Sequence, residues 1–237
     1  MTTWLEDLLT TTAGAESAED LFARIASAAA SLGFEYCAYG LRAPLPLSNP
    51  RTAFLNNYPC AWCERYAEAG YVHVDPTVRH ATRSQAPLLW SDMAFHATPK
   101  LWEEARGHGL RHGWAQGMRD ANGLAGMLTL ARPLGSIDRK ELKHQEVRMR
   151  CLASFAHMEL PRLLAPQLAL DSPPELTGRE VEVLKWTADG KTAGEISNLL
   201  SVSENTVNFH VKNAVSKLCA ANKTAAVVRA AMLGLLT

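Results

Sequence analysis

The chain has no long apolar run and no leader segment of the kind that marks membrane and secreted proteins. No stretch of its 237 residues approaches the roughly 20 apolar residues of a membrane span. The first residues carry Glu6 and Asp7, where a secretory signal has a basic region followed by an apolar one. The five cysteines are odd in number and scattered, which fits a reducing compartment better than a disulfide framework. We therefore expect a cytoplasmic protein.

An excess of either charge is also missing. The 24 Lys and Arg residues balance the 24 Asp and Glu residues, so the formal net charge is zero. This balance excludes a broadly basic coat for nucleic acid. Any affinity for DNA must come from the local placement of cations and should depend strongly on salt. The length allows one domain of moderate size and a second, small module.

The sequence contains none of the usual enzyme or metal motifs. It has no phosphate-binding loop and no nucleophile elbow. Cys60 and Cys63 form a single C-x-x-C, without the second pair or spaced histidines of a zinc site. His108 and His112 have helical spacing, but a glycine follows each of them. We expect no catalytic activity, no cofactor and no bound metal.

The C-terminal third, residues 176–236, reads as four short helices. Thr177 with Glu180, and Thr192 with Glu195, form capping boxes that each predict the start of a helix. Gly190 supplies a left-handed stop between these two helices.

The two later helices have caps of their own. Ser203 ends a tight turn and can cap the third helix, and Asn222 can cap the fourth. The apolar positions expected to face the core are Val181, Leu184, Ala188, Ala193, Ile196, Leu200, Val207, Val211, Ala214, Leu218, Val228, Met232 and Leu235. Two short helices joined by a tight turn, the second with a polar outer face, predict a helix-turn-helix.

The outer face of the third helix is rich in hydrogen-bond donors and cations, which suit base edges and phosphates. The candidate DNA contacts are Ser203, Asn205, Thr206, Asn208, His210, Lys212, Asn213 and Lys217. No acidic residue follows Glu204, while four cations do. An ordinary solvated helix is the alternative, but caps, turn and charge asymmetry together favour DNA binding.

This segment resembles the LuxR-type helix-turn-helix of bacterial transcription regulators. The matching positions are Glu180, Leu184, Gly190, Glu195, Ile196, Thr206, Val207, His210 and Lys217. The resemblance implies that residues 203–218 enter the major groove of double-stranded DNA, usually as a homodimer on a two-fold symmetric site.

The N-terminal part reads as mixed α/β. Pro161 and Pro166 are expected to end a long helix, and the following prolines predict a linker over 166–174 between domains at 1–165 and 175–237. Helices are expected at 18–32, 101–108 and 140–161, and strands at 34–41, 52–57, 112–118 and 124–132, the last two as a hairpin. The pattern predicts an α+β chain: an α-β-α sandwich around an antiparallel sheet, followed by a four-helix module.

Aromatic residues gather in the middle of this domain, around one acid. Tyr58, Trp62, Tyr66 and Trp90 lie near Asp75, which precedes a proline. One interpretation is an aromatic core with Asp75 capping the next helix. The other is a closed pocket for a mostly apolar ligand whose amide N–H meets the carboxylate. Composition alone favours the first.

The same block resembles the autoinducer-binding domain of LuxR-type quorum-sensing receptors. The matching positions are Trp62, Tyr66, Asp75, Pro76, Trp90 and Gly113. The ligand implied is an N-acyl-homoserine lactone. Residues 39–50 are similar to the QscR-like subgroup, which implies a medium to long acyl chain, although Ala38 stands where that subgroup can place a hydroxyl for a 3-oxo group.

The resemblance also implies a role for each pocket residue. Trp62 donates to the lactone carbonyl, and Trp90 packs on the lactone ring. Asp75 accepts from the amide N–H, and Tyr58 donates to the amide carbonyl with help from Thr129. The residues implied for the acyl tail are Gly40, Phe54, Tyr66 and Val78.

The leading hypothesis is thus a lactone-controlled transcriptional regulator that acts on promoters as a dimer. Saturating ligand would stabilise its dimer-competent fold by about 3–4 kcal/mol. One alternative is a ligand-independent DNA-binding regulator whose N-terminal domain serves dimerisation or protein interaction. Another is an enzyme fused to a DNA-binding module, which no triad or metal-ligand pattern supports.

Overall fold

The computed structural model describes residues 2–168 and 174–236. The chain divides into two compact units, an N-terminal one built on a sheet and its helices and a C-terminal helical one. Residues 169–173 of the expected linker lie outside the described residues. Within the described ranges, no helix is both long and apolar enough to cross a membrane.

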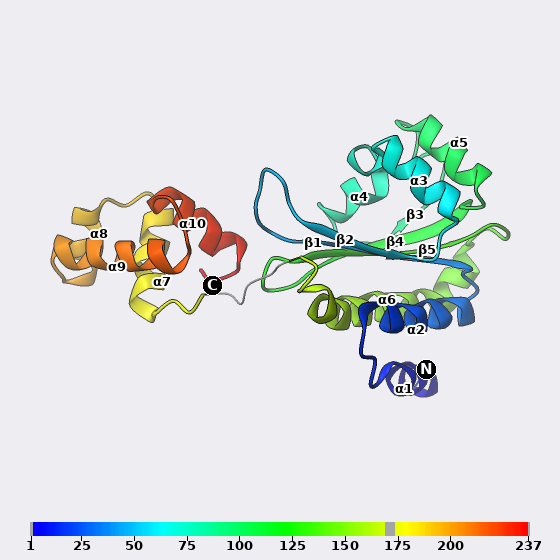
Figure 1. Cartoon of the computed structure of the whole chain (residues 1–237), viewed down its shortest axis with the longest axis horizontal. Coiled ribbons are helices and arrows are strands. Elements are labelled where there is room, and N and C mark those ends of the chain that lie inside the picture. The colour runs from blue at the N-terminus through cyan, green and yellow to red at the C-terminus, as the bar shows by residue number, and fades with distance from the viewer. Residues whose placement is uncertain (1, 169–173, 237) are drawn as a thin grey trace. The chain divides into compact units, whose positions relative to one another are not determined.

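The N-terminal unit is built on an antiparallel sheet. Five strands are described: β1 (Tyr36–Arg42), β2 (Thr52–Asn56), β3 (Leu88–Leu89), β4 (His112–Arg119) and β5 (Ala125–Arg132). Their order is β2-β1-β5-β4-β3, and all pairs are antiparallel (Figure 1). β4 and β5 form the predicted hairpin, whose turn is closed by Asp120 Oδ1 accepting from the amides of Asn122 and Leu124.

Helices cover both faces of the sheet (Figure 1). One layer holds α2 (Ala18–Ser31) and α6 (Arg139–Leu164), with α1 (Thr2–Thr12) packed against α2. The other holds α3 (Cys60–Glu68), the 3₁₀ turn η1 (Tyr71–His73), α4 (Pro76–Ala81) and α5 (Pro99–Gly107). The predicted α-β-α sandwich is confirmed. The sequence did not predict α3, because Pro59 at its cap offers no side-chain hydrogen bond and Trp62 is its one fully buried residue.

The expected end of α6 at Pro161 is wrong, since the helix continues to Leu164. A proline inside a helix removes one backbone hydrogen bond. Here the ladder resumes at once, because the Pro161 carbonyl accepts from the amide of Ala165 at 2.9 Å. Leu160 and Leu164 on either side are fully buried, and that burial offsets the missing bond.

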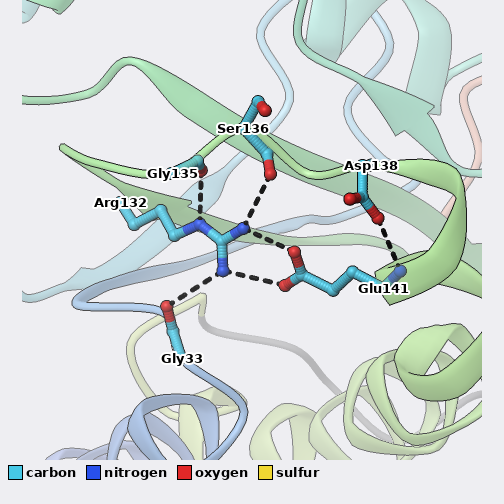
Figure 2. A network of polar contacts seen from close by, with 6 residues as sticks. All are labelled: Gly33, Arg132, Gly135, Ser136, Asp138 and Glu141. Carbon is cyan, nitrogen blue, oxygen red and sulfur yellow. Dashed lines mark hydrogen bonds and ion pairs between the residues drawn. The ribbon is translucent and has the colours of Figure 1, made fainter.

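Arg132, at the end of β5, joins three segments of this unit (Figure 2). Its guanidinium forms a bidentate pair with Glu141 at the start of α6, at 2.6 and 2.8 Å. It also donates to the carbonyls of Gly135 at 2.7 Å, Ser136 at 3.2 Å and Gly33 at 3.5 Å. Because both charged side chains are less than one-fifth exposed, this is a well-shielded ion pair that fixes the sheet against α2 and α6.

The described part of the C-terminal unit consists of α7 (Gly178–Ala188), α8 (Ala193–Leu200), α9 (Glu204–Lys217) and α10 (Lys223–Met232). Both predicted capping boxes are present, with Thr177 and Thr192 each exchanging hydrogen bonds with the glutamate three residues on. Ser203 and Asn222 cap α9 and α10 as predicted. Gly190 has the expected left-handed backbone, with φ of 85°.

Three expected core positions in this unit are wrong. Val183, not Val181, is buried on α7, and Ala188 is exposed. Val228 on α10 is 38 % exposed. The helices approach one another through small side chains, so alanines take the inward positions that we assigned to larger residues. The buried cluster consists of Leu184, Ala214, Leu218, Ala226 and Ala230.

Candidate ligand pocket and DNA-binding surface

A cavity of about 360 Å³ lies against the sheet, under the layer of α3, α4 and α5. This volume falls within the usual range of roughly 300–1,000 Å³ for small-molecule pockets. Nine of the ten residues predicted to bind ligand line it: Gly40, Phe54, Tyr58, Trp62, Tyr66, Asp75, Val78, Trp90 and Thr129. Residues far apart in the sequence thus meet at one site.

The tenth residue, Gly113, lies behind the cavity wall. Its carbonyl accepts from the amide of Trp90 at 2.8 Å, just beyond the β3–β4 pairing. A Cβ at position 113 would overlap the indole ring of Trp90. Gly113 is therefore a positioning residue, because the absence of its side chain lets Trp90 lie flat against β4.

Asp75 caps α4 and faces the cavity at the same time, so the two interpretations of this residue are compatible. Its Oδ1 accepts from the Thr77 amide at 2.8 Å and the Thr77 hydroxyl at 2.6 Å. Its Oδ2 accepts from the Tyr66 hydroxyl at 2.9 Å. A carboxylate has about four acceptor positions, so one is left for a donor from a ligand. Burial raises the pKa of Asp75, although these three hydrogen bonds act in the opposite direction.

Tyr58 and Thr129 form a second polar group on the cavity wall. Their side chains share a hydrogen bond, and burial raises the pKa of Tyr58 well above its ordinary value. Tyr58 therefore stays protonated and keeps an O–H to donate. Asn56 Oδ1 holds this segment by accepting from the Tyr58 amide and the Cys63 thiol, each at 3.1 Å.

Aromatic rings make up much of the remaining wall. Trp62 packs edge-on against Tyr66, with ring centres 5.7 Å apart, and stacks with Tyr71 at 6.1 Å. Trp90 packs edge-on against Phe95 at 5.9 Å. Such pairs hold the rings in fixed orientations and leave an apolar surface toward the cavity.

Sequence reasoning missed several lining residues: Phe95, Leu101, Ala105, Leu110 and Met127. Two of them carried a usable signal. Met127 is two positions before Thr129 on β5, and alternate strand residues share a face. Leu101 and Ala105 have i, i+4 spacing on α5, which predicts a common face.

An ion pair holds α3 against α5 above the cavity. Arg65 donates to both oxygens of Glu104, at 2.7 and 2.9 Å. The Tyr71 hydroxyl donates to the same carboxylate at 2.8 Å. The hydrogen bonds from Arg65 and Tyr71 lower the pKa of Glu104 to about 2, so the pair persists in mild acid. It fixes the helix that carries Trp62 and Tyr66.

Most predicted DNA contacts lie on the accessible side of α9. Ser203, Asn205, Asn208, Lys212 and Lys217 are exposed, and Thr206, His210 and Asn213 are half-buried. Ser203 also caps the helix, its Oγ accepting from the Thr206 amide at 3.1 Å. Phe209 is an exposed residue of this helix that the sequence reasoning did not consider.

Lys217 has a structural contact that the sequence did not predict. Its ammonium donates to Glu180, a buried residue of the first capping box, at 2.8 Å. Burial alone would raise the pKa of Glu180. The hydrogen bonds from Lys217 and Thr177 outweigh that effect and lower the pKa. The pair ties the end of α9 to the start of α7.

Comparison with known proteins identifies both units. Residues 17–160 match the autoinducer binding domain, and residues 174–230 match the bacterial regulatory proteins of the luxR family. The chain belongs to the LuxR family. It is an autoinducer-binding transcriptional regulator of quorum sensing with a helix-turn-helix DNA-binding domain. The family resemblance seen in the sequence is confirmed.

Relatives of this LuxR-family regulator are similar over its whole length. It is 45 % identical to the transcriptional activator AnoR of Acinetobacter nosocomialis, with both chains fully covered. The crystal structure of Escherichia coli SdiA matches 100 % of this chain and 99 % of its own, with a TM-score of 0.81 and 36 % identity. SdiA has also been solved with octanoyl-rac-glycerol.

A third structure covers the N-terminal part. CepR2 of Burkholderia cenocepacia, an N-acylhomoserine lactone dependent LuxR family transcription factor, is 36 % identical. The match covers 69 % of this chain and 96 % of that one, with a TM-score of 0.64. The relatives are transcriptional regulators rather than enzymes, so the comparisons do not favour a fused hydrolase.

Proposed function

We propose that the cavity binds an N-acyl-homoserine lactone and that the occupied protein binds promoter DNA as a homodimer. The observation that carries this proposal is the pairing of an apolar cavity with two polar groups on its wall, Asp75 and the Tyr58–Thr129 pair. An acyl-homoserine lactone has the matching chemistry. It offers one amide N–H, one amide carbonyl, a lactone carbonyl and an apolar tail.

Each polar atom of the ligand has a partner in this arrangement. Asp75 uses its fourth acceptor position for the amide N–H, and Tyr58 donates to the amide carbonyl with Thr129 beside it. Trp62 donates its indole N–H to the lactone carbonyl. Trp90, held flat by Gly113, packs on the lactone ring. Buried polar groups without partners are costly, so this matching gives the site its selectivity.

The acyl tail lies along Gly40, Phe54, Tyr66 and Val78. Gly40 on β1 leaves the space that the Phe54 ring occupies, since a Cβ there would lie 3.2 Å from that ring. We assign a medium to long acyl chain to this channel. Ala38, also in the wall, offers no hydroxyl, which favours a chain unsubstituted at its third carbon.

Ligand and DNA binding are linked through the dimer. We assign residues 1–165 to the ligand domain, 166–174 to a linker and 175–237 to the DNA-binding domain, acting in the cytoplasm. A ligand that binds only the dimer-competent fold stabilises it by about 3–4 kcal/mol at several hundred times its Kd. Two copies of α9 then lie about one DNA turn apart, with Ser203, Asn205, Thr206, Asn208, His210, Lys212, Asn213 and Lys217 facing the duplex.

A thermal-unfolding panel tests the ligand assignment. The purified chain is heated with N-acyl-homoserine lactones of increasing chain length and, separately, with octanoyl-rac-glycerol. We expect a rise in Tm that peaks at one medium or long lactone and is lost in Trp62→Phe. A larger rise with the acylglycerol would replace the lactone as the ligand. No rise with any compound, in a soluble chain that still binds DNA, would favour the ligand-independent regulator.

A further inference from the structure

One apolar side chain stands in the middle of the polar outer face of α9. Phe209 is 59 % exposed, whereas Val207 and Ala214 of the same helix are buried. At about 100° per residue, Phe209 lies about 200° around the helix from Val207, almost opposite the core. Single exposed apolar residues are ordinary on protein surfaces. The place of this one is not, because it occupies the centre of the predicted DNA-facing side.

The neighbours of Phe209 on that side are polar or cationic. Asn205 and Asn213 lie one turn before and one turn after it, and Lys212 lies three positions on. The ring of His210 packs edge-on against the Phe209 ring, with centres 5.7 Å apart and an interplanar angle of 67°. The phenyl ring is thus braced from one side and open on the other.

The chemistry of the major groove supplies one apolar partner for such a ring. Base edges there present hydrogen-bond donors and acceptors, with one exception, the 5-methyl group of thymine. The amides around Phe209 suit adenine edges, and Lys212 suits phosphate or guanine. A phenyl ring among them has no hydrogen-bonding function and can only make apolar contact.

We propose that Phe209 is a specificity-determining residue that packs on the 5-methyl group of a thymine in each half-site. This inference rests on the proposed function, in that α9 must enter the major groove. Phe209 adds sequence selectivity without charge. Its contribution should therefore be insensitive to salt, unlike that of Lys212.

Replacing thymine by deoxyuridine removes the methyl group alone and so tests the contact directly. Wild-type full-length protein, with N-octanoyl-homoserine lactone present, selects its preferred duplex from a random library. Each thymine of that duplex is then replaced in turn, and affinities are measured for wild type, Phe209→Ala and Phe209→Leu. Met93→Ala, which truncates an 82 % exposed apolar residue of the other unit, is the matched control.

For wild type and Met93→Ala, we expect one thymine per half-site whose replacement weakens binding about 4-fold, as loss of one buried methyl predicts. Phe209→Ala should bind the selected duplex about 5- to 50-fold more weakly, in the range of one lost base contact, and should be indifferent to that replacement. Phe209→Leu should show a smaller penalty than wild type, and it serves alone if Phe209→Ala does not fold.

Two kinds of failure are distinguishable. If Asn208→Ala and Lys212→Ala bind as tightly as wild type, α9 does not enter the groove and the proposed function of this helix fails. If those variants bind weakly but Phe209→Ala keeps full affinity or the wild-type uracil penalty, only the role of Phe209 is overturned. A selected half-site without thymine would overturn it as well.

Discussion

Replacing Asp75 with asparagine should separate ligand binding from folding. The cap of α4 survives, because an amide oxygen can still accept from the Thr77 amide, now at 2.8 Å from Oδ1, and Asn caps helices as well as Asp does. The amide nitrogen then takes the place of Oδ2, which accepts from Tyr66. The Tyr66 hydroxyl can rotate and become the acceptor. The free energy of unfolding should change by less than about 1 kcal/mol, since both cap and contact persist.

The effect on the ligand should be large. The amide N–H of a lactone would face the N–H of asparagine, so the complex loses a hydrogen bond to a charged group. Such bonds contribute about 1.5–3 kcal/mol, which corresponds to roughly 10- to 150-fold in Kd. Isothermal titration calorimetry with N-octanoyl-homoserine lactone measures this change. Asp138→Asn is the matched control, because Asp138 caps α6 in the same way.

The same site predicts a dependence on pH. Burial raises the pKa of Asp75, so the free protein binds a proton there more tightly than the unfolded chain does. Protonation therefore favours the free folded state in acid, and this contribution disappears as pH rises through the raised pKa. The ligand N–H requires the carboxylate, so lactone affinity should fall as pH falls through that same pKa, and Asp75→Asn should remove this dependence. Equal affinity of Asp75→Asn and wild type would refute the assigned role.

Three other substitutions test the scaffold around the two sites. Gly113→Ala should push the indole of Trp90 into the cavity and weaken lactone binding, since overpacking costs about 1–3 kcal/mol; calorimetry measures it. Arg132→Lys cannot keep five hydrogen bonds with three donors and should lower the free energy of unfolding by about 2 kcal/mol, whereas Arg150→Lys at a more exposed pair should change it by less than about 0.5 kcal/mol; urea titration measures both. Glu180→Gln should lower the thermal stability of the DNA-binding unit at neutral pH. Because the pKa of Glu180 is lowered, the difference from wild type should vanish as pH falls through it.

Local signals in the sequence predicted the C-terminal unit well. Caps at Thr177, Thr192, Ser203 and Asn222 act between residues three positions apart, so the spacing alone predicts where each helix begins. The packing between helices was predicted less well. It depends on distance between axes, which selects Ala226 and its neighbours over larger side chains, and no local pattern reports that distance.

The pocket shows the same division. Asp75 was predicted both as a helix cap and as a ligand contact, but its composition-based reading could not show that it does both. Gly113 was named from the family resemblance alone, and only the register of β3 against β4 explains it. The Glu180–Lys217 pair joins residues 37 positions apart, and such a contact is invisible until α7 and α9 are placed together.

The central claim is that lactone in the N-terminal cavity controls DNA binding by the C-terminal unit. Measuring the Kd of the full-length chain for its selected duplex, with and without saturating lactone, tests it most directly. The account predicts tighter DNA binding with lactone and, by linkage, an equal tightening of lactone binding by DNA. Identical DNA affinity in the two conditions, with lactone bound, would contradict it.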